Sequence, residues 1–575
     1  MTVLLEDGGQ VCFQTNAEGE LVFATLPEIS GGVDKNYQLK KEGDWFYFCD
    51  PERGRVTMFE PIPFNANLFR PRTVEDRNGN RLTYTYRYAN YDSNPAGIED
   101  NEGRKLYFSY ESYTTPSWGV RERLAAVSDH VGRVWTFLYE TNAPDNNGRL
   151  TFRSVTGPDG ATTRFVYAPN GFTYEPGNMA SNLPLLAAVV EPEGNATFSN
   201  EYAATQLHPE TPIHPRCVAQ TDAHGNRLTL SMSYTNGNFV GSVTNADGRT
   251  NRFVHHNHHD VPPASICDES GNTVALGRNA SGHIRSVTDR LGGTTSLGYD
   301  ATGRRLETIT NANGQVLSYL YQTATQTFHN ASAGHDVDFV FEDLARVVHP
   351  DGTAEAILRD GRGNATSITD RAEAVWRVEY DAQGRTVSTV GPTGGETRYS
   401  YATNGTLTSV TNSDGFSQRY GHDELFRLTS ASNADGTSVR VDYDVLGRTT
   451  QTVDEAGASH AFEYDANGNL VRAVDALGNA ETFWRDAMNN NTSVVDRTGG
   501  RVSCEYNSRG RPKTFIQATG VRTQVGYGPD GRATHMAVGA LTESREYNAE
   551  HLPVGAMDPA GRTFALQRDA LVIGP

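Results

Sequence analysis

The sequence predicts an all-β protein assembled from tandem β-hairpins of about twenty-one residues. The first observation is a series of glycines spaced twenty-one residues apart: Gly394, Gly415, Gly436, Gly457, Gly478, Gly499 and Gly520. The second is a Tyr-Asp-x-x-Gly-Arg series halfway between them, as in Tyr443-Asp444-Val445-Leu446-Gly447-Arg448. A period this regular indicates one supersecondary unit copied many times. We therefore expect a continuous antiparallel strip that spirals into a hollow shell or a β-solenoid.

Between the two turn series lie segments of about seven residues that alternate in polarity as β-strands do. Val439, Val441 and Tyr443 share one face, and Arg440 and Asp442 belong to the other. The return strands place an apolar residue six positions after the turn glycine, at Val390, Val453, Val474 and Ile516. Two strands and two turns account for the whole repeat, so no helix fits within it.

The turns explain the recurrent glycines and aspartates. Glycine adopts the positive φ that tight turns demand, and an Asp or Asn just upstream can accept hydrogen bonds from nearby backbone N–H groups. We expect this role for Asp414, Asp435, Asp454, Asp475 and Asp496. Carboxylate pairs for acid–base chemistry could be drawn at will from so many turn aspartates, and we therefore predict no catalytic residue among them.

The strip must curve, because β-sheets twist with a fixed hand. The period does not decide whether the curved strip closes around a filled interior or forms a hollow wall. The chain contains 26 tyrosines, whose rings pack while their hydroxyl groups need a polar neighbour. A wall whose inner side is wetter than an ordinary core would suit them.

Three regions are expected along the chain. Residues 1–70 are dense in aromatics and lack the Tyr-Asp signature, which indicates an N-terminal β cap or divergent repeats. Residues 71–370 carry irregular repeats with loop insertions such as residues 141–148, 169–183 and 206–215, and residues 371–575 carry the regular repeats.

The composition of the chain limits which partners and which cellular settings we expect. The net charge of −19 disfavours nucleic acid and favours a cationic partner. Five scattered cysteines do not indicate a disulfide framework. No stretch approaches the length of an apolar membrane span, and the N-terminus lacks the basic region of a signal peptide.

The densest group of metal-ligand residue types is His255-His256-Asn257-His258-His259-Asp260, with Cys267 nearby. Its spacing does not match a structural zinc site, and we interpret it as a strand end and turn before Val261-Pro262-Pro263. Asp360-Gly361-Arg362-Gly363-Asn364 resembles a phosphate-binding loop, but no helix follows it, and we expect a turn. We predict no catalytic, cofactor-binding or metal-binding residues and no cofactor.

The repeated Tyr-Asp-x-x-Gly-Arg motif, with Asp76-Arg77-Asn78-Gly79-Asn80-Arg81-Leu82 upstream, resembles the YD-repeat or Rhs family of bacterial polymorphic toxins. Relatives of that family include teneurins and the shells of insecticidal toxin complexes. The resemblance implies a β-strip cocoon that encloses a toxin polypeptide for delivery to competing bacteria, often by type VI secretion with a spike protein. It also implies a bacterial cytoplasmic origin and specialised export without a cleavable signal peptide.

Family shells end in a plug with an Asp-Pro-x-Gly-Leu-type cleavage motif, and here Asp558-Pro559-Ala560-Gly561-Arg562 is the nearest match. It carries Arg at the last position and fits the repeat phase, so we expect another turn. We expect a shell segment, a truncated product or one half of a split protein, without its toxin. Two alternatives are an extended surface that binds glycans or cell-surface proteins, and a self-processing protease region.

Overall fold

The computed structural model describes residues 2–4, 10–15, 21–23, 37–62, 65–87, 94–115, 119–140, 151–168, 185–205, 214–235, 237–246, 248–256, 263–268, 271–280, 282–507, 510–528, 532–547 and 553–565. These residues form strands and turns, with no helix among them. The described residues therefore contain no helix that is long and apolar enough to cross a membrane. The all-β prediction is confirmed.

The strip begins after three short strands, β1 (Thr2–Leu4), β2 (Gln10–Thr15) and β3 (Leu21–Phe23), which form their own sheet. Its first winding contains β4 (Gln38–Glu42), β5 (Trp45–Asp50), β6 (Arg55–Ile62), β7 (Asn65–Asp76), β8 (Arg81–Tyr86), β9 (Pro95–Asp100), β10 (Lys105–Thr115), β11 (Gly119–Asp129), β12 (Val134–Tyr139), β13 (Phe152–Thr156), β14 (Thr162–Tyr167), β15 (Leu186–Val190), β16 (Ala196–Thr205), β17 (His214–Asp222), β18 (Arg227–Thr235), β19 (Asn238–Thr244), β20 (Thr250–His256), β21 (Ser265–Cys267), β22 (Thr273–Arg278), β23 (Ile284–Thr288), β24 (Thr294–Tyr299) and β25 (Leu306–Thr310).

The second winding contains β26 (Val316–Asn330), β27 (His335–Val348), β28 (Ala354–Arg359), β29 (Ala365–Thr369), β30 (Val375–Tyr380), β31 (Thr386–Val390), β32 (Glu396–Tyr401), β33 (Leu407–Thr411), β34 (Ser417–His422), β35 (Leu428–Ser432), β36 (Ser438–Tyr443), β37 (Thr449–Val453), β38 (Ser459–Tyr464), β39 (Leu470–Val474), β40 (Ala480–Arg485), β41 (Asn491–Val495), β42 (Arg501–Tyr506), β43 (Pro512–Ile516), β44 (Arg522–Tyr527), β45 (Ala533–Val538), β46 (Leu541–Tyr547), β47 (Pro553–Met557) and β48 (Thr563–Ala565).

From β5 to β47 each strand pairs antiparallel with the strands that precede and follow it in sequence. Within the described residues β4 pairs only with β5 and β48 only with β47, so the strip is not closed. This confirms the predicted continuous antiparallel strip. Its two edges are the two turn series of the sequence.

The strands of the regular repeat are six and five residues long, as in β36 and β37, and so are shorter than the seven residues expected. Val439, Val441 and Tyr443 are half-buried, whereas Arg440 and Asp442 on the other face are exposed. The predicted faces of this strand are thereby confirmed.

The return-strand valines lie on the polar face. Val453 is directly opposite Arg440, and Thr452 is opposite Val441. Because residues that face each other across an antiparallel pair project to the same side, the tyrosine face receives threonine from the return strand. Both faces of the wall are therefore of mixed polarity.

Each regular repeat has one β-bulge, and it always lies beside the tyrosine position. The register shifts between Asp442 and Tyr443, and again between Glu463 and Tyr464 one repeat later. The pairings that lead to the other edge have no such shift. A bulge bends a strand and increases its twist, so an asymmetric bulge in every repeat curves the strip in one direction.

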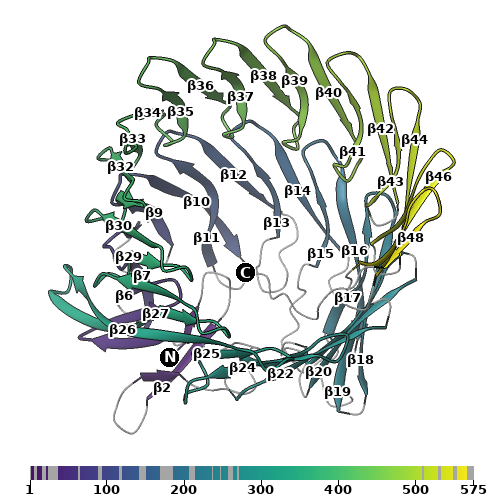
Figure 1. Cartoon of the computed structure of the whole chain (residues 1–575). Helices are drawn as coiled ribbons and strands as arrows, with labels where there is room; N and C mark the ends of the chain where they lie inside the picture. The colour runs from purple at the N-terminus through teal and green to yellow at the C-terminus, as the bar shows by residue number, and fades with distance from the viewer. Residues whose placement is uncertain are drawn as a thin grey trace.

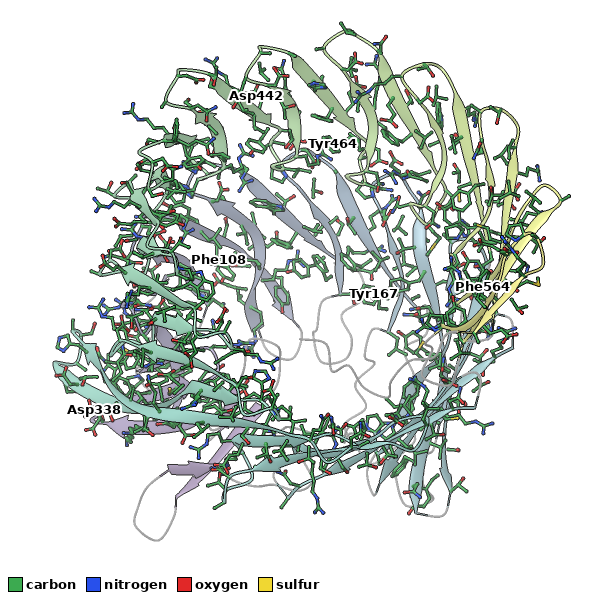
Figure 2. The ribbon with its side chains drawn as sticks, viewed as in Figure 1. Phe108, Tyr167, Asp338, Asp442, Tyr464 and Phe564 are labelled. Carbon is green, nitrogen blue, oxygen red and sulfur yellow. The ribbon has the colours of Figure 1, made fainter. Side chains whose placement is uncertain are left out.

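The curved strip winds around a ring and overlaps its own beginning (Figure 1). The long hairpin β26–β27 reaches the N-terminal strands β5 and β6, and from there the second winding lies beside the first. Side chains of the described residues line the wall, and Phe108 and Tyr167 are seen toward the middle of the ring (Figure 2).

Among the described residues the larger of two hydrophobic clusters lies where the windings meet. It combines Tyr47, Cys49, Val56 and Met58 of the first winding with Phe328, Val337, Phe339 and Phe341 of the second. In the described part of β28–β48, by contrast, Ala473 is the sole apolar residue that is buried. The regular repeats therefore form a wall one sheet thick rather than a filled solenoid.

Candidate functional surface: the turn edges and the seam between windings

The Tyr-Asp-x-x-Gly-Arg motif forms a tight turn at one edge of the strip, which we call the YD edge. In the turn of Asp444, the carboxylate Oδ1 accepts hydrogen bonds from the backbone N–H groups of Leu446 and Arg448, both at 2.9 Å. Its Oδ2 accepts from Nε of Arg448 at 2.6 Å. Gly447 closes the turn in the left-handed conformation, with φ of 89°, and its N–H donates to the carbonyl oxygen of Asp444 at 3.0 Å. The aspartate is thus fully engaged by its own turn.

The arginine of each motif also reaches the next repeat. Arg448 Nη1 donates to the carbonyl oxygen of Asp465 at 3.2 Å, and its guanidinium lies 5.0 Å from the centre of the Tyr464 ring. The Tyr464 hydroxyl donates to the carbonyl oxygen of Thr449 at 2.9 Å. The same stacking recurs between Arg385 and Tyr401, 4.8 Å apart. The YD edge is therefore a ladder of alternating arginine and tyrosine side chains that ties successive hairpins together.

The ionisation of these groups follows their surroundings. Burial raises the pKa of the Asp444 carboxyl, but hydrogen bonds from the Arg448 side chain and backbone outweigh burial, and the net pKa is lowered. The carboxyl pKa values of Asp381 and Asp423 are lowered for the same reasons. Burial raises the pKa of Tyr401, so its hydroxyl stays a hydrogen-bond donor at neutral pH.

The glycine series forms the opposite edge, which we call the ladder edge. Asp454 Oδ1 accepts from the N–H groups of Ala456 and Ala458, and Asp475 and Asp496 act in the same way. These three aspartates are the turn formers that the sequence predicted.

For Asp414 the prediction is wrong, because Asn412 begins that turn and accepts the hydrogen bonds from the N–H groups of Asp414 and Phe416. Asp435 does accept from the N–H group of Thr437, but as the third residue of a turn that Asn433 begins. In the turns of Asn412, Asp454, Asp475 and Asp496 the capping side chain is therefore the one three residues before the glycine.

Ladder-edge turns of the first winding contact YD-edge turns of the second winding. We call this contact zone the seam; the residues it joins by hydrogen bonds are between 249 and 312 positions apart. Arg77 Nη1 lies 2.7 Å from Asp343 Oδ1, and its guanidinium lies 4.4 Å from the centre of the Phe341 ring. Asn78 and Asn364 exchange amide hydrogen bonds at 3.2 and 2.9 Å.

Farther along the seam, side chains of the first winding meet backbone carbonyl oxygens of the second. A ring nitrogen of His130 lies 3.0 Å from the carbonyl oxygen of Glu424. Arg133 and Arg249 donate to the carbonyl oxygens of Val445 and Gly528, each at 3.3 Å. The cationic and aromatic side chains of the first winding therefore complement the negative ends of turn dipoles in the second.

Several glycines of the YD edge leave room for first-winding side chains. A Cβ built on Gly363 would lie 2.3 Å from Arg77, one on Gly384 would lie 2.4 Å from Asn78, and one on Gly405 would lie 2.3 Å from Glu102. On the ladder edge of the second winding, a Cβ on Gly394 or Gly415 would meet nothing within 4 Å. Glycine thus serves both the turn and the docking at the seam.

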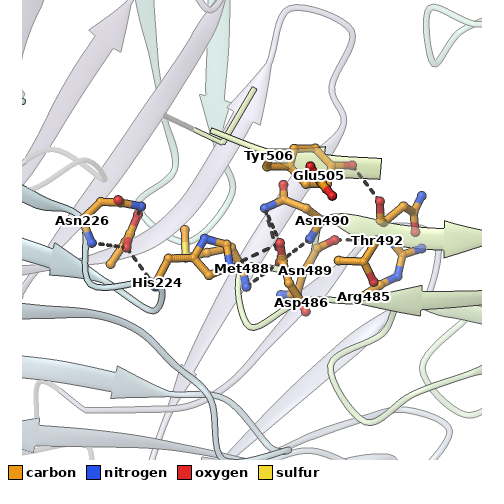
Figure 3. A network of polar contacts seen from close by, with 12 residues as sticks. His224, Asn226, Arg485, Asp486, Met488, Asn489, Asn490, Thr492, Glu505 and Tyr506 are labelled. Atoms are coloured by element: carbon orange, nitrogen blue, oxygen red, sulfur yellow. Dashed lines mark hydrogen bonds and ion pairs between the residues drawn. The ribbon is translucent and has the colours of Figure 1, made fainter. Parts of the chain in front are cut away.

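A cavity of about 560 Å³ opens at the seam where His224 Nε2 lies 3.2 Å from Asp486 Oδ2 (Figure 3). Asp486 Oδ1 also accepts from the N–H groups of Met488 and Asn490. Cys504 and Tyr506 line the cavity, and burial raises the pKa of the Cys504 thiol. A paired carboxylate and a protonated thiol do not make a nucleophilic centre.

The candidate sites singled out from the sequence lie at turns and strand ends. His255 and His256 belong to β20, Cys267 ends β21, and residues 257–260 lie outside the described residues. Among the described residues no group of three or more His, Cys, Asp or Glu side chains could hold a metal ion.

Two further turn predictions are confirmed. Asp360 Oδ1 caps its own turn by accepting from the N–H groups of Arg362 and Asn364. Asp558 does so for Ala560 and Arg562, in the repeat phase expected for a turn.

Sequence reasoning missed the seam residues Arg77, Asn78, His130 and His224. Their turns carry basic or amide side chains, but so do ladder turns of the second winding, such as residues 370–374 with Arg371 and residues 496–500 with Arg497. The residue types of these turns therefore give no signal by which the seam could have been found from the sequence.

Comparison with known proteins gives one family. The model described as "RHS Repeat" matches residues 278–323, 359–397, 401–438 and 443–480. No curated protein matches.

Among solved structures, the chain is similar to "Crystal Structure of TcdB2-TccC3-Cdc42", with 11% identity, a TM-score of 0.37, and coverage of 91% of this chain and 33% of that one. For "Crystal Structure of TcdB2-TccC3" the identity is 11%, the TM-score 0.29 and the coverage 97% and 37%. For the Photorhabdus luminescens Tc holotoxin pore with the mutation TccC3-D651A, the values are 11%, 0.29, 88% and 32%. The chain spans about a third of the length of these structures.

Proposed function

Because this chain is an RHS-repeat protein, we propose that it is a structural shell segment whose wall encloses a partner polypeptide. The wall works by shape and surface rather than by catalysis. The polypeptide that it holds is a toxin segment, kept apart from the producing cell until it is delivered to a competitor. Delivery uses a specialised secretion apparatus, with a spike protein as a further partner.

The observation that carries this proposal is the single-layer wall. The described part of β28–β48 buries one apolar residue, Ala473, so these repeats have no interior core of their own. Backbone pairing along the strip and the arginine–tyrosine ladder at the YD edge stabilise the wall instead. A wall held together in this way does not need a filled interior, which leaves space for cargo.

The surface chemistry favours a polar or cationic cargo. The chain has a net charge of −19, and the tyrosine face mixes aromatic, threonine and valine side chains. A strongly apolar inner face would trap an unfolded polypeptide irreversibly. A face of mixed polarity allows weak contacts with many sequences, and acidic groups attract basic segments over the screening length of the solvent.

Electron microscopy of the purified full chain tests the shape. We expect ring-like particles with a density-poor centre. A solid particle with uniform density would contradict enclosure.

Co-expression with a basic, unfolded polypeptide tests the cargo preference, with an acidic polypeptide of equal length as the control. The basic polypeptide should co-purify at low salt, be released as ionic strength rises, and resist protease while it is bound. Equal retention of both polypeptides, or full protease sensitivity of the retained one, would contradict the proposed enclosure of cationic cargo.

A further inference from the structure

Two YD-edge turns of the second winding depart from the motif at the glycine position. Phe426 has φ of 64° and Asn489 has φ of 62°, and each occupies the place that Gly447 holds in its own turn. The left-handed conformation is unfavourable for a residue with a side chain, and more so for phenylalanine than for asparagine. Backbone strain of this kind persists where the surroundings require that side chain.

Both side chains reach the first winding. The Phe426 ring lies 6.1 Å from the ring of His130 and 5.5 Å from the guanidinium of Arg104, which belong to two successive ladder turns. Asn489 Nδ2 donates to Glu191 Oε2 at 3.1 Å.

The turn of Asn489 also lies between two ladder turns. Glu191 belongs to the ladder turn at residues 191–195, while Asp486 of the same YD turn contacts His224 of the following ladder turn (Figure 3). Each of the two departing turns thus contacts two ladder turns of the first winding.

The number of turns on each side of the seam explains why such positions exist. Between the contacts Asn78–Asn364 and Arg249–Gly528 the first winding has seven ladder turns, which begin at residues 76, 100, 129, 157, 191, 222 and 245, whereas the second winding has nine YD turns, which begin every twenty-one residues from 360 to 528. Seven turns and nine turns cannot match one to one along the seam. At Gly363, Gly384 and Gly405 the first winding supplies the side chain and the second winding supplies bare backbone. At Phe426 and Asn489, by contrast, the second winding supplies the side chain that reaches the first winding.

We infer that Phe426 and Asn489 are positioning residues that set the register of the second winding on the first. A glycine turn presents a smooth backbone, on which a neighbouring edge can slide. The Phe426 side chain is held between two turns of that edge, and the turn of Asn489 contacts two of them through Asn489 and Asp486, so both turns block sliding. The inference rests on the seam and not on the proposed cargo. It can therefore fail while the proposed function stands, and the proposed function can fail while this inference stands.

Hydrogen exchange of the full chain tests the inference through Phe426→Gly. We expect the amides of residues 100–104 and 129–133 to exchange at least about fivefold faster, because an aromatic and cation contact is lost. The strands β34 and β35 should keep their protection, because glycine relieves the turn. Unchanged exchange in both ladder turns would overturn the inference for Phe426.

Asn489→Asp keeps the size of the side chain but places a carboxylate beside Glu191. Exchange at residues 191–195 should rise, and adding Glu191→Gln to this variant should restore it. A variant that exchanges like the native chain, or that Glu191→Gln does not rescue, would overturn the inference for Asn489.

Glu373→Gly is the matched control. Glu373 also has φ of 64°, but it is exposed on the ladder edge of the second winding and has no contact with the first winding among the described residues. Its replacement should raise the thermal midpoint by relief of strain and leave exchange at both sets of ladder turns unchanged. If Glu373→Gly speeds exchange there as much as Phe426→Gly does, the effect is not specific to the seam and the inference fails.

Discussion

Arg77 and Asp343 form an ion pair of 2.7 Å between residues that are 266 positions apart in the sequence. The two side chains are only 10% and 15% exposed, and Arg77 Nε also donates a hydrogen bond to Gln326 Oε1 at 3.1 Å. The pair joins the ladder turn at residues 76–80 to the long hairpin that begins the second winding. It therefore marks the point where the strip meets itself.

Arg77→Ala should destabilise this junction by about 3 to 5 kcal/mol, because it leaves the buried carboxylate of Asp343 without a partner. Urea unfolding followed by tyrosine fluorescence measures the loss. The matched control is Arg371→Ala, since Arg371 pairs with Asp351 at an exposed site where both side chains are about half accessible. The control should cost less than about 1 kcal/mol. Equal effects of the two variants would contradict the importance of the junction.

Gly384→Ala and Gly394→Ala separate the two roles of glycine. Both residues have positive φ, 76° and 85°, so alanine strains each turn. Only at Gly384 would the new Cβ also collide with Asn78 across the seam. We expect Gly384→Ala to lower the thermal midpoint further than Gly394→Ala and to speed hydrogen exchange in residues 76–80. Equal midpoints, with native exchange at residues 76–80, would show that the seam tolerates the added carbon.

The stability of the YD edge should fall in acid. The carboxyl pKa values of Asp381, Asp423 and Asp444 are lowered in the folded chain. Their contribution is therefore fully present above the ordinary carboxyl pKa of about 3.9. It is lost as the pH falls below that value and through the lowered pKa, because protonation breaks the pairing with arginine.

Asp444→Asn tests this pH dependence. The variant should melt below the native chain at pH 7, and the difference should shrink as the pH falls below about 4. Asp442→Asn is the control, because Asp442 is exposed on the strand face two residues away. It should change the midpoint little at either pH. A difference for Asp444→Asn that stays constant from pH 7 to pH 3 would contradict the role of its charge.

Cys49 should resist thiol reagents in the folded chain. It is fully buried in the core between the windings, and burial raises the pKa of its thiol to about 12. Since the thiolate is the reactive form, alkylation of Cys49 should need opening of this core. Mass spectrometry after a timed pulse of iodoacetamide compares it with the half-exposed Cys504. Prompt labelling of Cys49 at the rate of Cys504 would show that the core opens readily, and Phe339→Ala should speed its labelling.

The repeat itself could be predicted because its interactions are local. Asp454 caps a turn that ends four residues later, and Arg448 contacts the hairpin that follows it. Such contacts depend on residue type and short spacing alone. The error at Asp414 is of the same local kind, since the cap sits three residues before the glycine and Asn412 holds that place.

The alternation of polar and apolar residues was not enough to predict which face of the sheet the return-strand valines occupy. Val453 lies with Arg440 because a bulge beside Tyr443 shifts the register of the pair. A one-residue shift moves every following side chain to the other face of a strand, and the period of the sequence does not reveal on which side of the turn that shift occurs.

The sequence by itself determined the all-β fold, the two turn edges and the continuous strip, because these follow from hydrogen bonds and turn geometry within about twenty residues. Only the tertiary structure decided that the ladder edge of the first winding meets the YD edge of the second, with Arg77 at Asp343 and His224 at Asp486. Those contacts between the windings depend on the curvature that each bulge and the twist of the strands add to the strip. Small bends in many repeats sum to a full winding, and the residues that they bring together carry no sign of one another in the sequence.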